Sequence, residues 1–145
     1  MIKLFQLIFI LYLGNTAPPA WQHDFEKAKQ IARDEHKLIL LNFSGSDWCG
    51  PCIRLHKEIF DSEPFLQYAE SNLVLLNADF PRMKKNQLPK ELQKQNDELA
   101  EKYNSKGIFP YTILLSEEGK IINTWEGYPD GTPQDFVQKI SANKN

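Results

Sequence analysis

Both cysteines of this 145-residue chain lie in one short motif, C-G-P-C at positions 49–52, and the position of that motif constrains the fold. The run 37–43 (K-L-I-L-L-N-F) precedes it and is typical of a strand covered on both faces. Residues 53–60 follow it with apolar residues at helical spacing, and Pro51 fits a first helical turn, where its missing N–H costs nothing. The sequence therefore predicts a C-x-x-C motif at a strand-to-helix junction, with Cys49 at the helix start.

This position has a chemical consequence for the two sulfur atoms. Two intervening residues let a first helical turn bring both sulfurs within disulfide reach, and the free N–H groups of a helix N-terminus favour a thiolate at Cys49. A decrease of the thiol pKa from about 8.5 to about 7 requires only about 2 kcal/mol of differential stabilisation. Cys52, one turn further, is expected to be more shielded. The motif thus predicts attack on a disulfide by Cys49 and resolution of the mixed disulfide by Cys52, or the reverse sequence.

The rest of the chain alternates between helical and strand patterns, with no internal repeat. Expected helices cover about 21–33, 62–69 (capped by Ser62), 88–103 and 132–140 (capped by Thr132), and expected strands cover 73–78, 111–116 and 120–126. Two strands with a helix between them should be parallel with a right-handed crossover, and the last two should form an antiparallel hairpin with a turn at Gly119. The predicted fold class is α/β, a mixed sheet with helices on both faces.

The motif and its surroundings resemble the thioredoxin superfamily. The segment S-G-S-D-W-C-G-P-C, the later L-L-N-A-D-F-P-R and the long basic loop after it are similar to exported, single-domain bacterial members. The resemblance runs from about Trp21 to the C-terminus. It implies a thioredoxin fold with an N-terminal helix extension over residues 21–145, a monomer, and a redox-active disulfide with no other cofactor and no metal.

The resemblance also implies roles for individual residues of the motif. Cys49 would be the nucleophile and Cys52 the resolving cysteine, and Trp48, Gly50 and Pro51 would complete the active-site motif. Trp48 would also belong to the substrate-recognition surface.

A second implied element is the proline that precedes the third strand. Pro110 would be the cis-proline opposite the active-site disulfide, and Phe109 and Pro110 would let the backbone pair with an extended substrate. Gly107 stands three residues before this proline, where thioredoxins have two, and bulky Phe109 precedes it. The substrate-binding backbone is therefore expected to differ in detail from that of thioredoxins.

Two further departures concern charge. Asn42 stands where thioredoxins carry a buried acid, and because an amide cannot take a proton from Cys52, water or another group must do so. Asp47 is nearby in sequence but is expected on the exposed loop. The long connection 79–90 carries extra cations, which favour an acidic partner: Arg82, Lys84, Lys85 and Lys90.

The N-terminus has the layout of a secretory signal. Lys3 precedes an apolar run from Leu4 to Leu13, and small or polar residues end it. Ten helical residues span about 15 Å, half of a hydrocarbon core of about 30 Å, which argues against a full transmembrane helix. We expect residues 1–20 to be a signal peptide and the protein to be exported to the periplasm or cell envelope. An uncleaved anchor and a buried N-terminal helix are the alternatives.

Composition and the cysteine count narrow the function classes. With 17 Lys and Arg against 19 Asp and Glu, the chain has no excess of positive charge, so its composition does not predict nucleic-acid binding. An inert disulfide across so short a loop would stabilise the fold little. Zinc on Cys49, Cys52 and His56 would lack a fourth ligand, and His56 is instead interpreted as a solvent-facing helix residue.

The leading hypothesis is therefore an exported dithiol–disulfide oxidoreductase. Its C-G-P-C motif resembles that of reducing thioredoxins, which favours a protein-disulfide reductase that is itself re-reduced by a membrane thiol reductant. Its substrates would be proteins that carry disulfides or dithiols. The alternatives are a disulfide oxidase or isomerase, and a thioredoxin-like module that binds proteins or carries a metal.

Overall fold

The computed structural model describes residues 17–144, so the predicted signal peptide lies almost wholly outside the described residues. Within the described part, no helix is long and apolar enough to cross a membrane. The elements follow the order α1 (Phe25–Glu35), β1 (Leu38–Ser44), α2 (Gly50–Leu55), η1 (His56–Phe60), α3 (Glu63–Asn72), β2 (Leu73–Asp79), η2 (Lys84–Asn86), α4 (Lys90–Tyr103), β3 (Tyr111–Leu115), β4 (Ile121–Glu126) and α5 (Pro133–Ser141).

The four strands form one mixed sheet in the order β2-β1-β3-β4. The parallel pairing of β1 with β2 and the antiparallel β3–β4 hairpin were both predicted and are confirmed. The expectation that strands with a helix between them are parallel is wrong for β3, which runs antiparallel to β1. The segment after α4 returns to the sheet edge where β1 ends, with Tyr111 opposite Phe43, so β3 must run back along β1.

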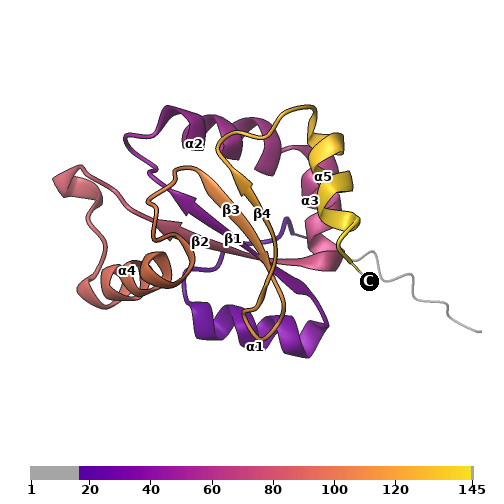
Figure 1. The fold of residues 1–145 in the computed structure, drawn as a ribbon, viewed down its shortest axis with the longest axis horizontal. Helices are drawn as coiled ribbons and strands as arrows, with labels where there is room; N and C mark the ends of the chain where they lie inside the picture. Colours follow the sequence, from indigo (N-terminus) through magenta and orange to yellow (C-terminus); the bar gives the residue numbers. More distant parts are fainter. Residues whose placement is uncertain (1–16, 145) are drawn as a thin grey trace, which may run out of the picture.

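Helices cover both faces of the sheet, as predicted. Helices α1 and α4 lie on one face, and α2, α3 and α5 lie on the other (Figure 1). Alternate residues of β1 serve the two cores: Ile39 and Leu41 pack on the α1 side, and Leu40 packs on the α3 and α5 side. This double coverage explains why the central strand is apolar throughout.

The N-terminal segment differs from its prediction. Helix α1 begins at Phe25, after Asp24 accepts a hydrogen bond from the Lys27 backbone N–H, and not at Trp21. The segment before it adds a short bridge to the edge strand: Gln22 N–H donates to Leu75 O at 2.7 Å. Trp21 had fitted the helical spacing, but this bridge places it with the core on the α3 and α5 side of the sheet.

Local signals elsewhere were reliable. Ser62 caps α3 and Thr132 caps α5, as predicted, and the Thr132 cap is reinforced by the Asp135 carboxylate. The helix that follows the C-x-x-C motif is less regular than expected. Helix α2 continues into η1, a π-helical turn in which Asp61 N–H donates to His56 O at 2.9 Å.

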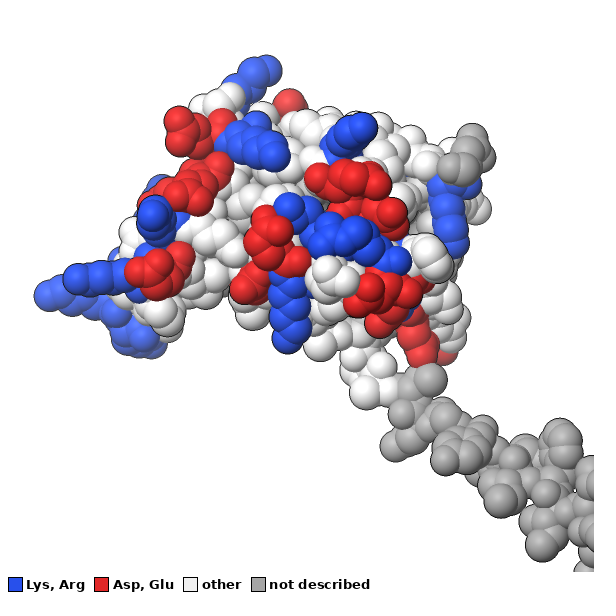
Figure 2. All heavy atoms as spheres, turned by 90° about the horizontal axis from the view of Figure 1, so that it is seen from below, with Lys and Arg blue, Asp and Glu red and all other residues white. Residues whose placement is uncertain are grey.

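Charges of both signs are interspersed over the face of the molecule seen in Figure 2. Lys and Arg side chains gather at the end of the molecule where Figure 1 places the connection between β2 and α4. This connection carries Arg82, Lys84 and Lys85, so the basic loop anticipated from the sequence projects from the sheet edge.

Candidate active site

The two cysteines form a disulfide at the N-terminus of α2. Cys49 is the N-cap residue, Pro51 lies in the first turn, and the Cys52 N–H donates to Cys49 Sγ at 3.3 Å. Cys49 is 5% exposed and Cys52 is fully buried. A backbone N–H directed at Sγ, together with the helix N-terminus, stabilises negative charge on Cys49 after reduction.

Trp48 lies beside the disulfide under an aromatic and cationic cover. Its indole Nε1–H donates to Phe80 O at 2.7 Å, and the Arg82 guanidinium lies 3.6 Å from the ring centroid. Gly45 makes this position possible, because a Cβ there would lie 2.3 Å from the indole ring. The Trp48 ring is thus fixed in a half-exposed position, where it forms one part of an aromatic wall beside the disulfide.

Phe109 and Pro110 join this wall from the segment before β3. The Phe109–Pro110 peptide bond, expected to be cis, is cis in the structure. Phe109 is half-buried and packs edge-on against Trp48 and Phe80, each at a centroid distance of 5.5 Å. The structure therefore brings Trp48 and Phe109 together, although 61 positions separate them in the sequence.

Asp47 holds the basic loop, a role that sequence reasoning missed. Its carboxylate accepts hydrogen bonds from the N–H groups of Arg82 and Met83, both at 2.9 Å, and from Asn86 Nδ2 at 3.0 Å. These donors, led by Arg82 N–H, hold the pKa of Asp47 below its ordinary value. Asp47 thus anchors the loop whose Arg82 covers Trp48.

On the other face of the sheet, Asn42 is fully buried in β1. Its Nδ2 donates to Thr112 Oγ1 at 3.0 Å, and its Oδ1 lies 3.3 Å from His56 Nε2. His56 is half-buried, and its ring packs against those of Trp21 and Phe60, each at a centroid distance of 5.0 Å. The interpretation of His56 as a solvent-facing residue is therefore wrong.

The signal for His56 was present in the sequence. His56 follows Cys52 by four positions, the spacing that places two side chains on the same helix face. Its contact with Trp21 was not foreseeable in the same way, because it depends on the Gln22 bridge, which brings Trp21 to this face.

A hollow of about 360 Å³ lies between α2, η1 and the ends of β1 and β2. Eight residues line it: Ser44, Ser46, Cys52, Ile53, His56, Lys57, Asp61 and Asn77. Asn77 Oδ1 is a buried acceptor without a donor among the described residues. The hollow has both polar and apolar lining residues, and it borders Cys52 as well as His56.

The surroundings of His56 disfavour its charged form. Partial burial lowers the pKa of His56 from its ordinary value of 6.5, and the carboxylates of Asp61 and Asp79 partly oppose this shift. His56 is therefore neutral at pH 7 and able to accept a proton.

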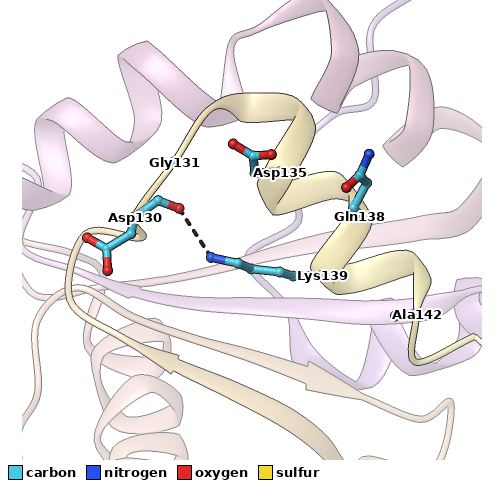
Figure 3. Close-up of a pocket in the computed structure, with 6 residues that line it drawn as sticks. All are labelled: Asp130, Gly131, Asp135, Gln138, Lys139 and Ala142. Atoms are coloured by element: carbon cyan, nitrogen blue, oxygen red, sulfur yellow. Dashed lines mark hydrogen bonds between the residues drawn. The ribbon is translucent and has the colours of Figure 1, made fainter.

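No group of three or more His, Cys, Asp or Glu residues in the described range 17–144 is arranged to hold a metal ion. A second hollow, of about 480 Å³, lies along α5 (Figure 3). Asp135 there belongs to the α5 cap, and Lys139 Nζ donates to Asp130 O at 3.2 Å. These polar groups are satisfied locally, and none of the predicted site residues lines this hollow.

A four-stranded mixed sheet, helices on both faces and a C-x-x-C disulfide at a helix N-terminus together define a thioredoxin-type thiol–disulfide oxidoreductase. Residues 25–143 match the family described as thioredoxin-like domain. The chain belongs to this family.

Two curated relatives come from Chlamydia pneumoniae. The chain is 33% identical over 135 residues to "Disulfide bond reductase DsbH", covering 90% of this chain and 78% of that protein. It is 30% identical over 102 residues to "Thioredoxin-related protein DsbJ", covering 70% of this chain but only 28% of that protein. Among solved structures, "DsbH Oxidoreductase" superposes with a TM-score of 0.78 at 32% identity, over 88% of this chain and 85% of that one.

Proposed function

We propose that this chain is an exported protein-disulfide reductase in which Cys49 is the nucleophile and Cys52 the resolving cysteine. The observation that carries the proposal is the asymmetric pair at the start of α2. Cys49 caps the helix and receives the Cys52 N–H, whereas Cys52 is fully buried one turn further. An oriented, stabilised thiolate in front of a shielded thiol suits a two-step exchange.

The exchange conserves two electrons. The Cys49 thiolate attacks one sulfur of a substrate disulfide, which releases the other substrate sulfur as a thiolate and leaves a mixed disulfide. Cys52 then loses its proton and attacks Cys49 Sγ, which forms the Cys49–Cys52 disulfide and releases the second substrate thiolate. The substrate gains two electrons and two protons, and the pair loses them.

Two arguments support reduction as the direction. The C-G-P-C motif resembles that of reducing thioredoxins. The relative that matches 90% of this chain is named a disulfide bond reductase. Continued turnover requires re-reduction of the pair, for which we propose a membrane thiol reductant as the donor.

The proposed substrate surface is the aromatic wall beside Cys49. Trp48 and Phe109 present half-exposed rings, and Pro110 directly precedes the strand that begins at Tyr111. An extended polypeptide next to its disulfide fits such a surface, because backbone pairing and aromatic contacts tolerate many sequences. The neighbouring cations of the basic loop favour partners with acidic segments.

Export rests on the N-terminal sequence. Residues 1–20 have the order of a signal peptide, a cation followed by an apolar run and then small residues, and residues 21–145 form the exported domain in this proposal. The periplasm or cell envelope is the proposed location.

Reduction of insulin disulfides with dithiothreitol as donor tests the activity. The wild-type chain should accelerate reduction, and Cys49→Ser and Cys52→Ser should each remove the acceleration. Efficient oxidation of a reduced protein without catalysed insulin reduction would instead indicate a disulfide oxidase. Protein binding retained by the double serine variant, with no activity in the wild type, would indicate a binding module.

A further inference from the structure

The resolving step of the proposed exchange requires removal of a proton from a fully buried thiol. A cysteine thiol has an ordinary pKa of about 8.5, and apolar burial raises it. Cys52 is fully buried, and Asn42, which stands where thioredoxins have a buried acid, has no titratable proton. Another group must accept the proton if resolution is to be fast at neutral pH.

His56 is placed to accept the proton of the Cys52 thiol. It lies one helical turn after Cys52, and both residues line the same hollow of about 360 Å³. A hollow of this size accommodates water, and Ser44 and Ser46 place hydroxyl-bearing residues along its lining. The shared hollow therefore offers a path through water from the thiol to the imidazole.

Asn42 fixes the orientation and the tautomer of the imidazole. Since Asn42 Nδ2 donates to Thr112 Oγ1, its Oδ1 is the acceptor that faces His56 Nε2 at 3.3 Å. The neutral ring then carries its proton on Nε2, which leaves Nδ1 as the basic atom. Trp21 and Phe60 pack against the ring and hold its plane.

The charged groups around His56 come from several elements. Lys57 in η1 and Asp61 directly after η1 line the hollow. Asp79 acts on His56 from the end of β2. The two carboxylates stabilise an imidazolium once it has formed, whereas partial burial keeps the resting ring neutral. A base that is neutral at the working pH is suited to this transfer.

We propose that His56 accepts the Cys52 thiol proton during the resolving step, through water in the hollow beside Cys52, with Asn42 as its positioning partner. The proposal rests on the two-step exchange above. The Cys52 S–H bond breaks as Nδ1 gains the proton, and the Cys52 thiolate forms the bond to Cys49 Sγ. The substrate sulfur leaves with the electron pair, and the imidazolium then returns the proton to that thiolate or to solvent.

Stopped-flow reaction of the reduced protein with one equivalent of an aryl disulfide that releases a coloured thiolate separates the two steps. The first release reports attack by Cys49, and the second reports resolution by Cys52. His56→Gln should leave the first rate unchanged and slow the second about tenfold at neutral pH. General-base catalysis often contributes about 10²-fold, but a thiol also ionises directly into solvent.

The pH profile distinguishes proton transfer from a structural effect. In the wild type, the second rate should level off above the pKa of His56, measured independently by NMR. In His56→Gln it should keep rising with pH. A carboxylate restored by Asn42→Asp in the His56→Gln background should recover most of the lost rate. His23→Gln, which changes an exposed histidine outside the hollow, is the matched control and should behave as wild type.

These measurements can contradict the proposed role of His56 in three ways. An unchanged second rate and profile in His56→Gln, or equal slowing of both releases, would overturn the role of His56. If the variant does not fold, a wild-type profile without an inflection at the His56 pKa overturns it as well. Absence of any second release in the wild type would instead contradict the roles proposed for Cys49 and Cys52.

Discussion

The residues near the disulfide differ in chemical character between the two faces of the sheet. On the α1 and α4 side, half-exposed Trp48 and Phe109 form an aromatic wall with Arg82 lying over the indole. On the opposite side, a buried Asn42 and a half-buried His56 border a polar hollow next to Cys52. In the proposed mechanism, substrate recognition and proton transfer would therefore lie on opposite sides of one disulfide.

The largest expected effect separates the two cysteines themselves. Cys52→Ser should accumulate mixed disulfides with substrate proteins through Cys49, because attack proceeds and resolution cannot. Cys49→Ser should accumulate none, because the remaining thiol is buried. Non-reducing electrophoresis with and without dithiothreitol reads out both variants, and equal trapping by the two would remove the assignment of roles.

The next effect concerns stability on the Cys52 side. Phe60 is fully buried and contacts the rings of Trp21, His56, Phe65 and Phe136. Phe60→Ala should lower the free energy of unfolding by about 3 to 5 kcal/mol, because it removes a large core side chain and leaves a cavity. Denaturant unfolding measures this loss, and a change below about 1 kcal/mol would contradict tight packing around Phe60.

Substitution of Phe109 should affect substrate turnover more than it affects the stability of the fold. Because it is half-buried on the aromatic wall, Phe109→Ala should cost only about 1 kcal/mol of stability. It should lower kcat/KM for a protein disulfide about fivefold, equivalent to about 1 kcal/mol of lost aromatic contact. Phe25→Ala changes another half-buried phenylalanine on the same side of the sheet, in α1, and is the matched control. Equal kinetic losses in the two variants would argue against a recognition role for Phe109.

The smallest effect is a pH dependence of stability from His56. The folded-state pKa of His56 is below its ordinary value of 6.5, so the unfolded state binds more protons as pH falls through that value. Wild-type stability should therefore fall relative to that of His56→Gln between about pH 8 and about pH 5. Paired denaturant unfolding curves measure the difference, and parallel curves over this range would contradict a neutral, partly buried imidazole.

Local sequence signals predicted much of the fold and the centre of the site. The C-x-x-C motif between a buried strand and a helix located the disulfide, and Ser62 and Thr132 marked helix starts because a capping side chain acts on its own next turn. The family resemblance supplied Pro110 and Phe109, which no local pattern identified.

The features that sequence reasoning missed depend on contacts between distant segments. The direction of β3 follows from where the chain re-enters the sheet, and Trp21 reaches His56 only because Gln22 bridges to β2. Asp47 looked like a loop carboxylate, and its role became visible only with its three donors more than 30 positions away. Helical periodicity has no information about such partners.

The reduction potential of the Cys49–Cys52 pair tests the central claim, that this chain is a reductase, most directly. Equilibration of the protein with dithiothreitol or glutathione buffers, followed by thiol alkylation, measures it. We predict a value of about −270 mV, similar to that of thioredoxin. A value of about −120 mV would contradict the claim and identify an oxidant whose reduced form is stabilised by a low-pKa Cys49 thiolate.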